Sequence, residues 1–183
     1  MYYDCIIAGF GGQGVLLMGN ILCYAGMEEN KNVTFMPVYG VEMRGGTANC
    51  TVAVSDDPIG SPVIQNPVSS IVMNLPSLEK FAPRVKKDGF LLVNGTLVTE
   101  EELAPYAELD HLRVPSRDLA LEAGNARLAN MVMLGAAIQK SGVVSLSVME
   151  QALVKGLDPK YHKMIPGNLK AIDEGAKFVA NAG

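Results

Sequence analysis

A glycine-rich segment near the amino end, Gly-Phe-Gly-Gly-Gln-Gly over residues 9–14, has the composition of a loop that binds phosphate groups. An apolar run typical of a buried strand precedes it and an apolar helix is predicted to follow, which is the context that a dinucleotide-binding fingerprint requires. We expect Gly9 to permit the tight turn, Gly11 to let backbone approach a phosphate, and Gly14 to let the helix pack closely on the strand. The exposed amides and the helix dipole favour an anion, and Gln13 adds a side-chain amide at the rim.

The acidic residue that usually accompanies such a loop is missing. Enzymes that bind dinucleotides place Asp or Glu about 20 residues further on, at the end of the second strand, where it binds the ribose hydroxyls. Here the second strand is predicted over residues 32–36 and stops at Pro37, whereas Glu28 and Glu29 come too early, at the end of the first helix. Ordinary NAD binding is therefore disfavoured. A Walker A loop is also excluded, because no lysine follows the glycines in the required pattern.

A second unusual segment, PVYGVEMRGGTANC over residues 37–50, is rich in glycine and polar groups. An arginine beside bare glycine amides suits a phosphate or a carboxylate, because the guanidinium fork and the amides can converge on one anion. Arg44, Gly45 and Gly46 have this arrangement just before a predicted strand. We expect this loop to border the same crevice as the first one. A surface turn in which Arg44 pairs with Glu42 remains the alternative.

Hydrophobic periodicity indicates the elements that must hold these loops. Strands are predicted over residues 4–8, 32–36, 47–54, 70–75, 90–94 and 111–114, and helices over residues 14–28, 76–86 and 166–182. Thr99 with Glu102, and Ser147 with Glu150, have the spacing of capping boxes that open two more helices. The alternation predicts an α/β fold with a Rossmann-like, doubly wound, mostly parallel sheet, helices on both faces and a mainly helical C-terminal part. Because no break in composition is visible, we expect a single domain over residues 1–183.

Composition limits the possible partners. Hydrophobic residues make up 49% of the chain and charged residues 19%, and the net charge is −4, so a basic face for nucleic acid is not expected. No apolar run approaches the roughly 20 residues that span a bilayer. The three cysteines are scattered, which favours reduced, buried thiols and a cytoplasmic location, and they lack the close spacing of an iron–sulfur or zinc site. We also find no nucleophile paired with a general base, and therefore assign no catalytic residue and no metal site.

Three segments in the same order carry a family resemblance: AGFGGQGV, YGVEMRGGTA and VAVSDDPIGSPVI. Together they resemble the gamma subunit of 2-oxoacid:ferredoxin oxidoreductases, and they are more similar to the 2-oxoglutarate and branched-chain types than to the pyruvate or indolepyruvate types. The resemblance implies a subunit of an enzyme of anaerobic metabolism that converts a 2-oxoacid and coenzyme A to acyl-CoA and carbon dioxide. In this family other subunits hold thiamine diphosphate, Mg²⁺ and the iron–sulfur clusters.

The resemblance also implies which residues bind coenzyme A. These are Gly11, Gly12, Gln13 and Gly14 in the first loop; Arg44, Gly45, Gly46 and Thr47 in the second; and Asn125, Arg127 and Asn130 in a third segment, GNARLANMVMLGA. The implied partners are alpha and beta subunits, a delta subunit as an open addition, and ferredoxin through the complex. The third segment has an alternative as an ordinary helix start with an exposed arginine. A free-standing dinucleotide-binding oxidoreductase and a nucleotide-binding module without enzyme activity remain the rival functions.

Overall fold

The computed structural model describes residues 1–39 and 47–182. Its strands are β1 (Tyr2–Phe10), β2 (Asn32–Tyr39), β3 (Thr47–Ser55), β4 (Ser69–Val72), β5 (Phe90–Asn94) and β6 (Asp110–Val114). Its α-helices are α1 (Val15–Glu28), α2 (Leu75–Phe81), α3 (Glu100–Leu103), α4 (Ser116–Glu122), α5 (Ala129–Ser141), α6 (Met149–Gly156) and α7 (Ile165–Ala182). Short 3₁₀ turns occur at Ala82–Arg84, Ala104–Tyr106, Ala126–Leu128, Leu146–Val148 and Pro159–Met164.

The strands form one six-stranded sheet in the order β2-β3-β1-β4-β5-β6. β1, β4, β5 and β6 are parallel, and β3 runs antiparallel to both of its neighbours. The predicted α/β class with a mostly parallel sheet is confirmed. In one respect the sheet differs from the expected doubly wound order, because β3 lies between β1 and β2. The pairing of β2 with β3 over residues 32–39 and 48–55 is that of an antiparallel hairpin, which brings the amino end of β3 to the carboxyl end of β1.

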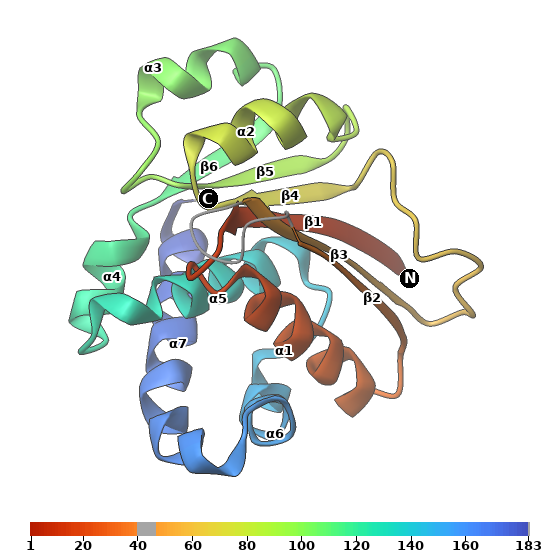
Figure 1. The fold of residues 1–183 in the computed structure, drawn as a ribbon, viewed down its shortest axis with the longest axis vertical. Coiled ribbons are helices and arrows are strands. Elements are labelled where there is room, and N and C mark those ends of the chain that lie inside the picture. Colours follow the sequence, from red (N-terminus) through yellow and green to blue (C-terminus); the bar gives the residue numbers. More distant parts are fainter. Residues whose placement is uncertain (40–46, 183) are drawn as a thin grey trace.

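Helices cover both faces of the sheet, as expected (Figure 1). α1, α5, α6 and α7 pack on one face, and α2 and α3 lie on the other. Because successive side chains of a strand point to opposite faces, Ile7 belongs to the larger core under α1 and α5 while Ile6 belongs to the smaller core under α2. The strands in the middle of the sheet are buried on both faces, and for that reason β1 and β5 are almost continuously apolar.

The C-terminal helices form a tight pair beneath the sheet. α5 and α7 cross so closely that a Cβ added at Gly135 would lie 1.9 Å from the carbonyl oxygen of Ile172, and one added at Gly175 would lie 1.9 Å from that of Val132. Any larger residue at either position would have to push the helix backbones apart. This packing fixes the position of α5 relative to α7. The first turn of α5 borders the site described below.

Several predicted element boundaries need correction. Pro37 does not end the second strand, since β2 continues to Tyr39. β2 is an edge strand, where proline is tolerated because one side of the strand needs no amide donor. The helix predicted over residues 76–86 ends as an α-helix at Phe81. Ser147 does not cap α6; a 3₁₀ turn precedes that helix, and Ser145 accepts the amide of Ser147 at its start. The capping box of Thr99 and Glu102 is confirmed.

Candidate functional site

A cavity of about 380 Å³ lies where the parallel strands β1, β4, β5 and β6 end. Ligands of open α/β sheets bind outside the carboxyl ends of the strands, so this is the expected position for a site. The described residues that line it are Gly12, Gln13, Gly14, Met73, Asn94, Thr96, Leu97, Ser116, Arg117, Ala126, Arg127, Ala129 and Asn130. Three of the four predicted residues of the first loop are among them.

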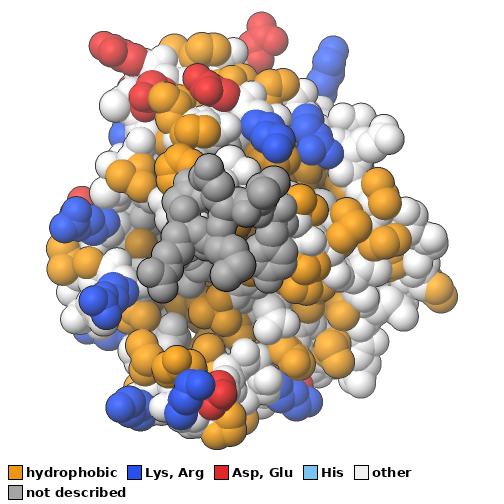
Figure 2. Space-filling model, viewed as in Figure 1, with side chains coloured by type: hydrophobic (Ala, Val, Ile, Leu, Met, Phe, Trp, Pro, Cys, Tyr) orange, Lys and Arg blue, Asp and Glu red, His pale blue; other side chains and the backbone are white. Residues whose placement is uncertain are grey.

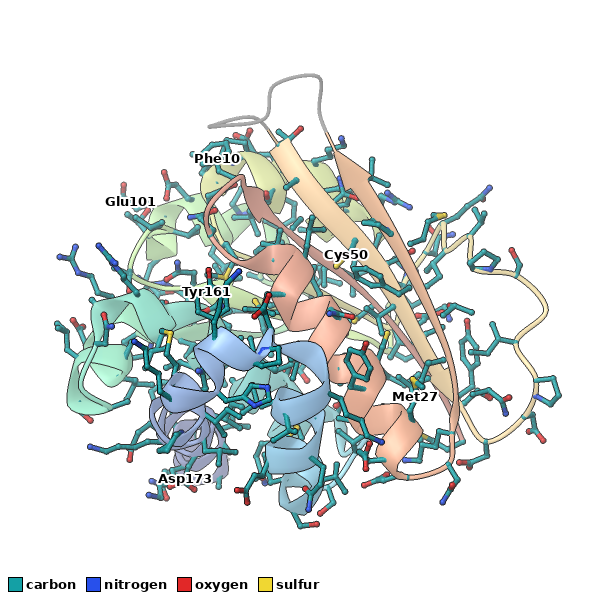
Figure 3. The ribbon with its side chains drawn as sticks, turned by 60° about the horizontal axis from the view of Figure 1, so that its bottom comes forward. Phe10, Met27, Cys50, Glu101, Tyr161 and Asp173 are labelled. Carbon is teal, nitrogen blue, oxygen red and sulfur yellow. The ribbon has the colours of Figure 1, made fainter. Side chains whose placement is uncertain are left out.

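The turn between β1 and α1 depends on Gly12 and Gly14, whose φ angles are +98° and +73°. Figure 3 shows Phe10 at the end of β1, beside this turn and the start of α1. The expected roles of two glycines must be corrected. Gly9 provides close packing, because a Cβ there would lie only 2.9 Å from Met73 Cβ, in the segment that follows β4. The left-handed backbone of the turn is provided by Gly14. Gly11 is exposed and does not line the cavity.

Gln13 does not present a free amide at the rim. Its Oε1 accepts the amide of Phe10 at 2.7 Å and the side-chain Nδ2 of Asn74 at 2.8 Å. Its Nε2 donates to the carbonyl of Met73 at 3.4 Å. Gln13 therefore stabilises the glycine loop and ties it to the start of α2, although part of its side chain still lines the cavity.

The floor of the cavity is a buried polar network at the ends of β4 and β5. Asn94 donates from Nδ2 to the carbonyl of Met73 at 3.2 Å, and its Oδ1 accepts the Ser116 hydroxyl at 2.7 Å and the amide of Thr96 at 3.1 Å. Thr96 in turn accepts the amide of Arg117 at 3.2 Å. These bonds fix the segments that follow β5 and β6 relative to one another.

The third predicted segment is only partly in the site. Asn125 accepts the amide of Arg127 at 3.0 Å, which caps the 3₁₀ turn Ala126–Leu128, and it does not line the cavity. Arg127 and Asn130 do line it. Asn130 is 8% exposed, and its side-chain amide makes no hydrogen bond with a described residue. It lies so close to the glycine loop that a Cβ at Gly14 would be 2.4 Å from Asn130 Nδ2.

Most of the predicted binding residues of the second segment lie outside the described part of the chain. Arg44, Gly45 and Gly46 lie outside the described residues, and their part in the site stays a prediction. Thr47 is exposed, begins β3 and pairs with Phe10, so it stands next to the first loop without lining the cavity.

Sequence reasoning missed the residues contributed by the ends of β5 and β6. Asn94 is the last residue of one predicted strand and Thr96 comes two residues later, while Ser116 and Arg117 come shortly after the next. A usable signal was present, because polar side chains just after neighbouring parallel strands meet at one edge of the sheet. Leu97, which is 53% exposed at the rim, carried no such signal.

The electrostatics of the cavity favour an anion. Arg117 and Arg127 are the charged groups among the described lining residues, and neither forms an ion pair with a described residue. The first turn of the 14-residue helix α1 adds the positive end of a helix dipole. Figure 2 shows basic side chains over α4, on the left of that view, while acidic side chains gather over α3 at the top.

The described lining residues contain no pair suited to acid–base or nucleophilic chemistry. The Ser116 hydroxyl donates to an amide oxygen rather than to a base. His111 and His162 lie elsewhere, and each ring contacts a nearby backbone carbonyl. In the described part of the chain, no group of three His, Cys, Asp or Glu residues could hold a metal ion. Within the same residues, no helix is both long and apolar enough to cross a bilayer.

Comparison with known proteins identifies the family to which this fold belongs. Residues 4–178 match the family described as pyruvate ferredoxin/flavodoxin oxidoreductase. The ketoisovalerate oxidoreductase subunit VorA of Methanothermobacter thermautotrophicus is 37% identical over 94% of this chain, and the chain spans only 35% of that protein's length. The 2-oxoglutarate synthase subunit KorC of Methanothermobacter marburgensis is 33% identical over 94% of each chain.

A solved structure agrees in fold along the whole chain. The gamma subunit of a keto/oxoacid ferredoxin oxidoreductase from Geobacter sulfurreducens superposes with a TM-score of 0.78 at 25% identity, covering 100% of this chain and 98% of that one. The resemblance seen in the three sequence segments is thus confirmed over nearly all residues. The chain belongs to the pyruvate ferredoxin/flavodoxin oxidoreductase family, and its fold is that of a gamma subunit of that family.

Proposed function

We propose that this chain is the gamma subunit of a 2-oxoacid:ferredoxin oxidoreductase that forms acyl-CoA and carbon dioxide from a 2-oxoacid and coenzyme A. In this proposal the chain shapes part of the active-site cleft and holds coenzyme A in the cavity at the ends of β1, β4, β5 and β6. The named relatives, a ketoisovalerate oxidoreductase and a 2-oxoglutarate synthase, favour a branched-chain 2-oxoacid or 2-oxoglutarate as the substrate.

The observation that carries the proposal is the composition of the cavity. Two arginines, the amino end of α1 and the buried amide of Asn130 converge on it, and none of its described lining residues is acidic. Such a set suits the phosphates of a nucleotide. Because the same residues offer no catalytic pair, the cavity is suited to binding and orientation rather than to bond making.

The sheet order argues against a free-standing dinucleotide enzyme. In that class an acidic residue at the end of the strand next to β1 binds the ribose. Here β1 lies between the antiparallel β3 and the parallel β4, and β3 separates it from β2. The sequence of β2, NVTFMPVY, contains no acidic residue in any case. We therefore prefer coenzyme A to NAD as the ligand.

The proposal assigns the redox chemistry to partner chains. Alpha and beta subunits, with a delta subunit as an open addition, would hold thiamine diphosphate, Mg²⁺ and the iron–sulfur clusters, and ferredoxin would act through the complex. Binding energy from the nucleotide end of coenzyme A would position its thiol for attack on the acyl intermediate. A cytoplasmic location fits the three free, buried cysteines, which suit a reducing compartment.

The test compares Arg127→Ala and Asn130→Ala with Lys87→Ala. Lys87 is an exposed lysine just before β5, at the opposite edge of the sheet, so its removal changes net charge without touching the cavity. Calorimetry on the full chain should show coenzyme A binding weakened by about tenfold or more in Arg127→Ala, since a hydrogen bond to a charged group contributes roughly 1.5–3 kcal/mol. Lys87→Ala should bind like the wild type.

The same variants should then be assembled with the partner subunits. We expect Arg127→Ala to raise the KM for coenzyme A while leaving the KM for the 2-oxoacid unchanged. A wild-type chain that binds no coenzyme A, either alone or in the complex, would refute the assignment. So would equal changes in the two KM values.

A further inference from the structure

The two arginines that line the cavity come from different elements. Arg127 precedes Asn130 by three residues, in the 3₁₀ turn Ala126–Leu128, and it lines the cavity together with Asn130, which packs against Gly14 at the amino end of α1. Arg117 is the second residue of α4, three residues after the end of β6. Both side chains line the same cavity from these separate elements.

The strand order separates the ends of the two strands that lead to these elements. β4 and β5 lie between β1 and β6, so the end of β6 is three strand spacings, or about 14 Å, from the end of β1 along the edge of the sheet. The cavity therefore receives its positive groups from two parts of the fold. One part is the amino end of α1 with Arg127 and Asn130, and the other is the start of α4 with Arg117.

The second part is held in position by the segment after β5. Thr96 accepts the amide of Arg117. The side chain of Arg113 donates to the carbonyl of Gly95 at 2.9 Å and to that of Val98 at 3.0 Å, which fixes the loop that carries Thr96 and Leu97. The exposed side chain of Leu97 supplies an apolar surface beside Arg117 at the rim.

Coenzyme A also carries negative charge in two places. It carries a diphosphate and, across one ribose, a separate 3′-phosphate, whereas NAD carries the diphosphate alone. Resting on the proposed function, we propose that Arg117 binds the ribose 3′-phosphate of coenzyme A while the α1 end with Arg127 binds the diphosphate. Arg117 is then the residue by which this chain distinguishes coenzyme A from dephospho-coenzyme A.

Binding of coenzyme A and of dephospho-coenzyme A to the full chain tests the assignment. The wild type should prefer coenzyme A by about tenfold or more, because the 3′-phosphate gains a charge-assisted contact. In Arg117→Ala this preference should fall to within about threefold. Arg117→Lys should keep part of it, since lysine preserves the charge but not the two-pronged donor. Arg127→Ala should weaken both ligands by the same factor, and Lys87→Ala should change neither.

The possible outcomes separate the two proposals. If the wild type binds coenzyme A and dephospho-coenzyme A equally well, Arg117 has no such role, while the proposed function stands. The same conclusion follows if Arg117→Ala and Arg127→Ala alter the preference alike. Where the isolated chain binds neither ligand, KM values for both ligands in the assembled complex give the same comparison. Failure of the complex to use coenzyme A would remove the proposed function itself. Thermal unfolding of each variant confirms that the exposed substitutions leave the fold intact.

Discussion

Gly14 and Asn130 pack closely against each other at the edge of the cavity. Gly14 has a left-handed backbone, and a Cβ there would lie 2.4 Å from Asn130 Nδ2. Two independent requirements therefore exclude a side chain at this position: the backbone angle, and the space occupied by a neighbour more than a hundred residues away in the sequence. Only the first of these can be anticipated from a glycine motif.

We predict that Gly14→Ala lowers the free energy of unfolding by about 2 kcal/mol or more, because an alanine in the left-handed region costs roughly 1–2 kcal/mol before any clash is added. Denaturant unfolding measures the loss. Adding Asn130→Ala to Gly14→Ala should restore the stability lost to the clash between the two side chains. The loss caused by the left-handed backbone of alanine should remain. Gly60→Ala serves as the control, since nothing lies within 4 Å of its Cβ position. Equal effects of Gly14→Ala and Gly60→Ala would contradict this account.

The type of each residue also determines how well its role at the site can be predicted from the sequence. Arg127, Asn130 and three of the four predicted residues of the glycine loop line the cavity, whereas Gly11 does not. Asn125 was predicted as a binding residue and instead caps a turn, because a free Asn side chain just before a helix start competes for its own backbone amides. Sequence alone does not reveal which of these two uses an asparagine has.

At the scale of elements, the loop after β1 is joined to the start of α2 through Gln13 and Asn74. Asn74 uses both ends of its side-chain amide: Nδ2 donates to Gln13 Oε1, and Oδ1 accepts the amide of Ser77 at 3.0 Å. One buried residue thus caps α2 and supports the glycine loop, so the stability of α2 and the geometry of the cavity are coupled.

We predict that Asn74→Ala destabilises the protein by roughly 2 kcal/mol, from a lost helix cap of about 1 kcal/mol and a lost buried hydrogen bond of similar size. It should also weaken binding of coenzyme A at a temperature where the variant is still folded. Thr99→Ala is the matched control, because it removes the cap of α3 by the same kind of bond but has no link to the loop. Loss of ligand binding in both variants would show that the effect is not specific to the loop.

For the molecule as a whole, the three cysteines lie in the large core between the sheet and the helices, and Figure 3 shows Cys50 under α1. Burial raises the pKa of Cys23 and of Cys50 to about 12, and it raises the pKa of Cys5 well above its ordinary value. Because the thiolate is the reactive form, these thiols are protected from alkylation in two ways: burial keeps reagents away from them, and the raised pKa keeps them protonated.

We predict that none of the three thiols is alkylated at pH 8 in the folded protein and that all three react together on unfolding. Mass spectrometry after a pulse of iodoacetamide across a urea titration measures this, and the reaction should follow the global transition. Alkylation of one cysteine well before the others would show that α1 separates from the sheet in a local opening rather than with the whole fold.

The sequence by itself determined the features that depend on near neighbours in the chain: the strands and helices, the glycine turn after the first strand, the Thr99 cap, the core position of the cysteines and the family resemblance. Only the tertiary structure decided that β3 separates β1 from β2, that Gln13 is used in internal hydrogen bonds, and that Arg117 reaches the cavity. Periodicity and turn chemistry are set within a few residues. The order of strands is set by packing between segments far apart in the sequence, and that order determines which side chains meet at the edge of the sheet.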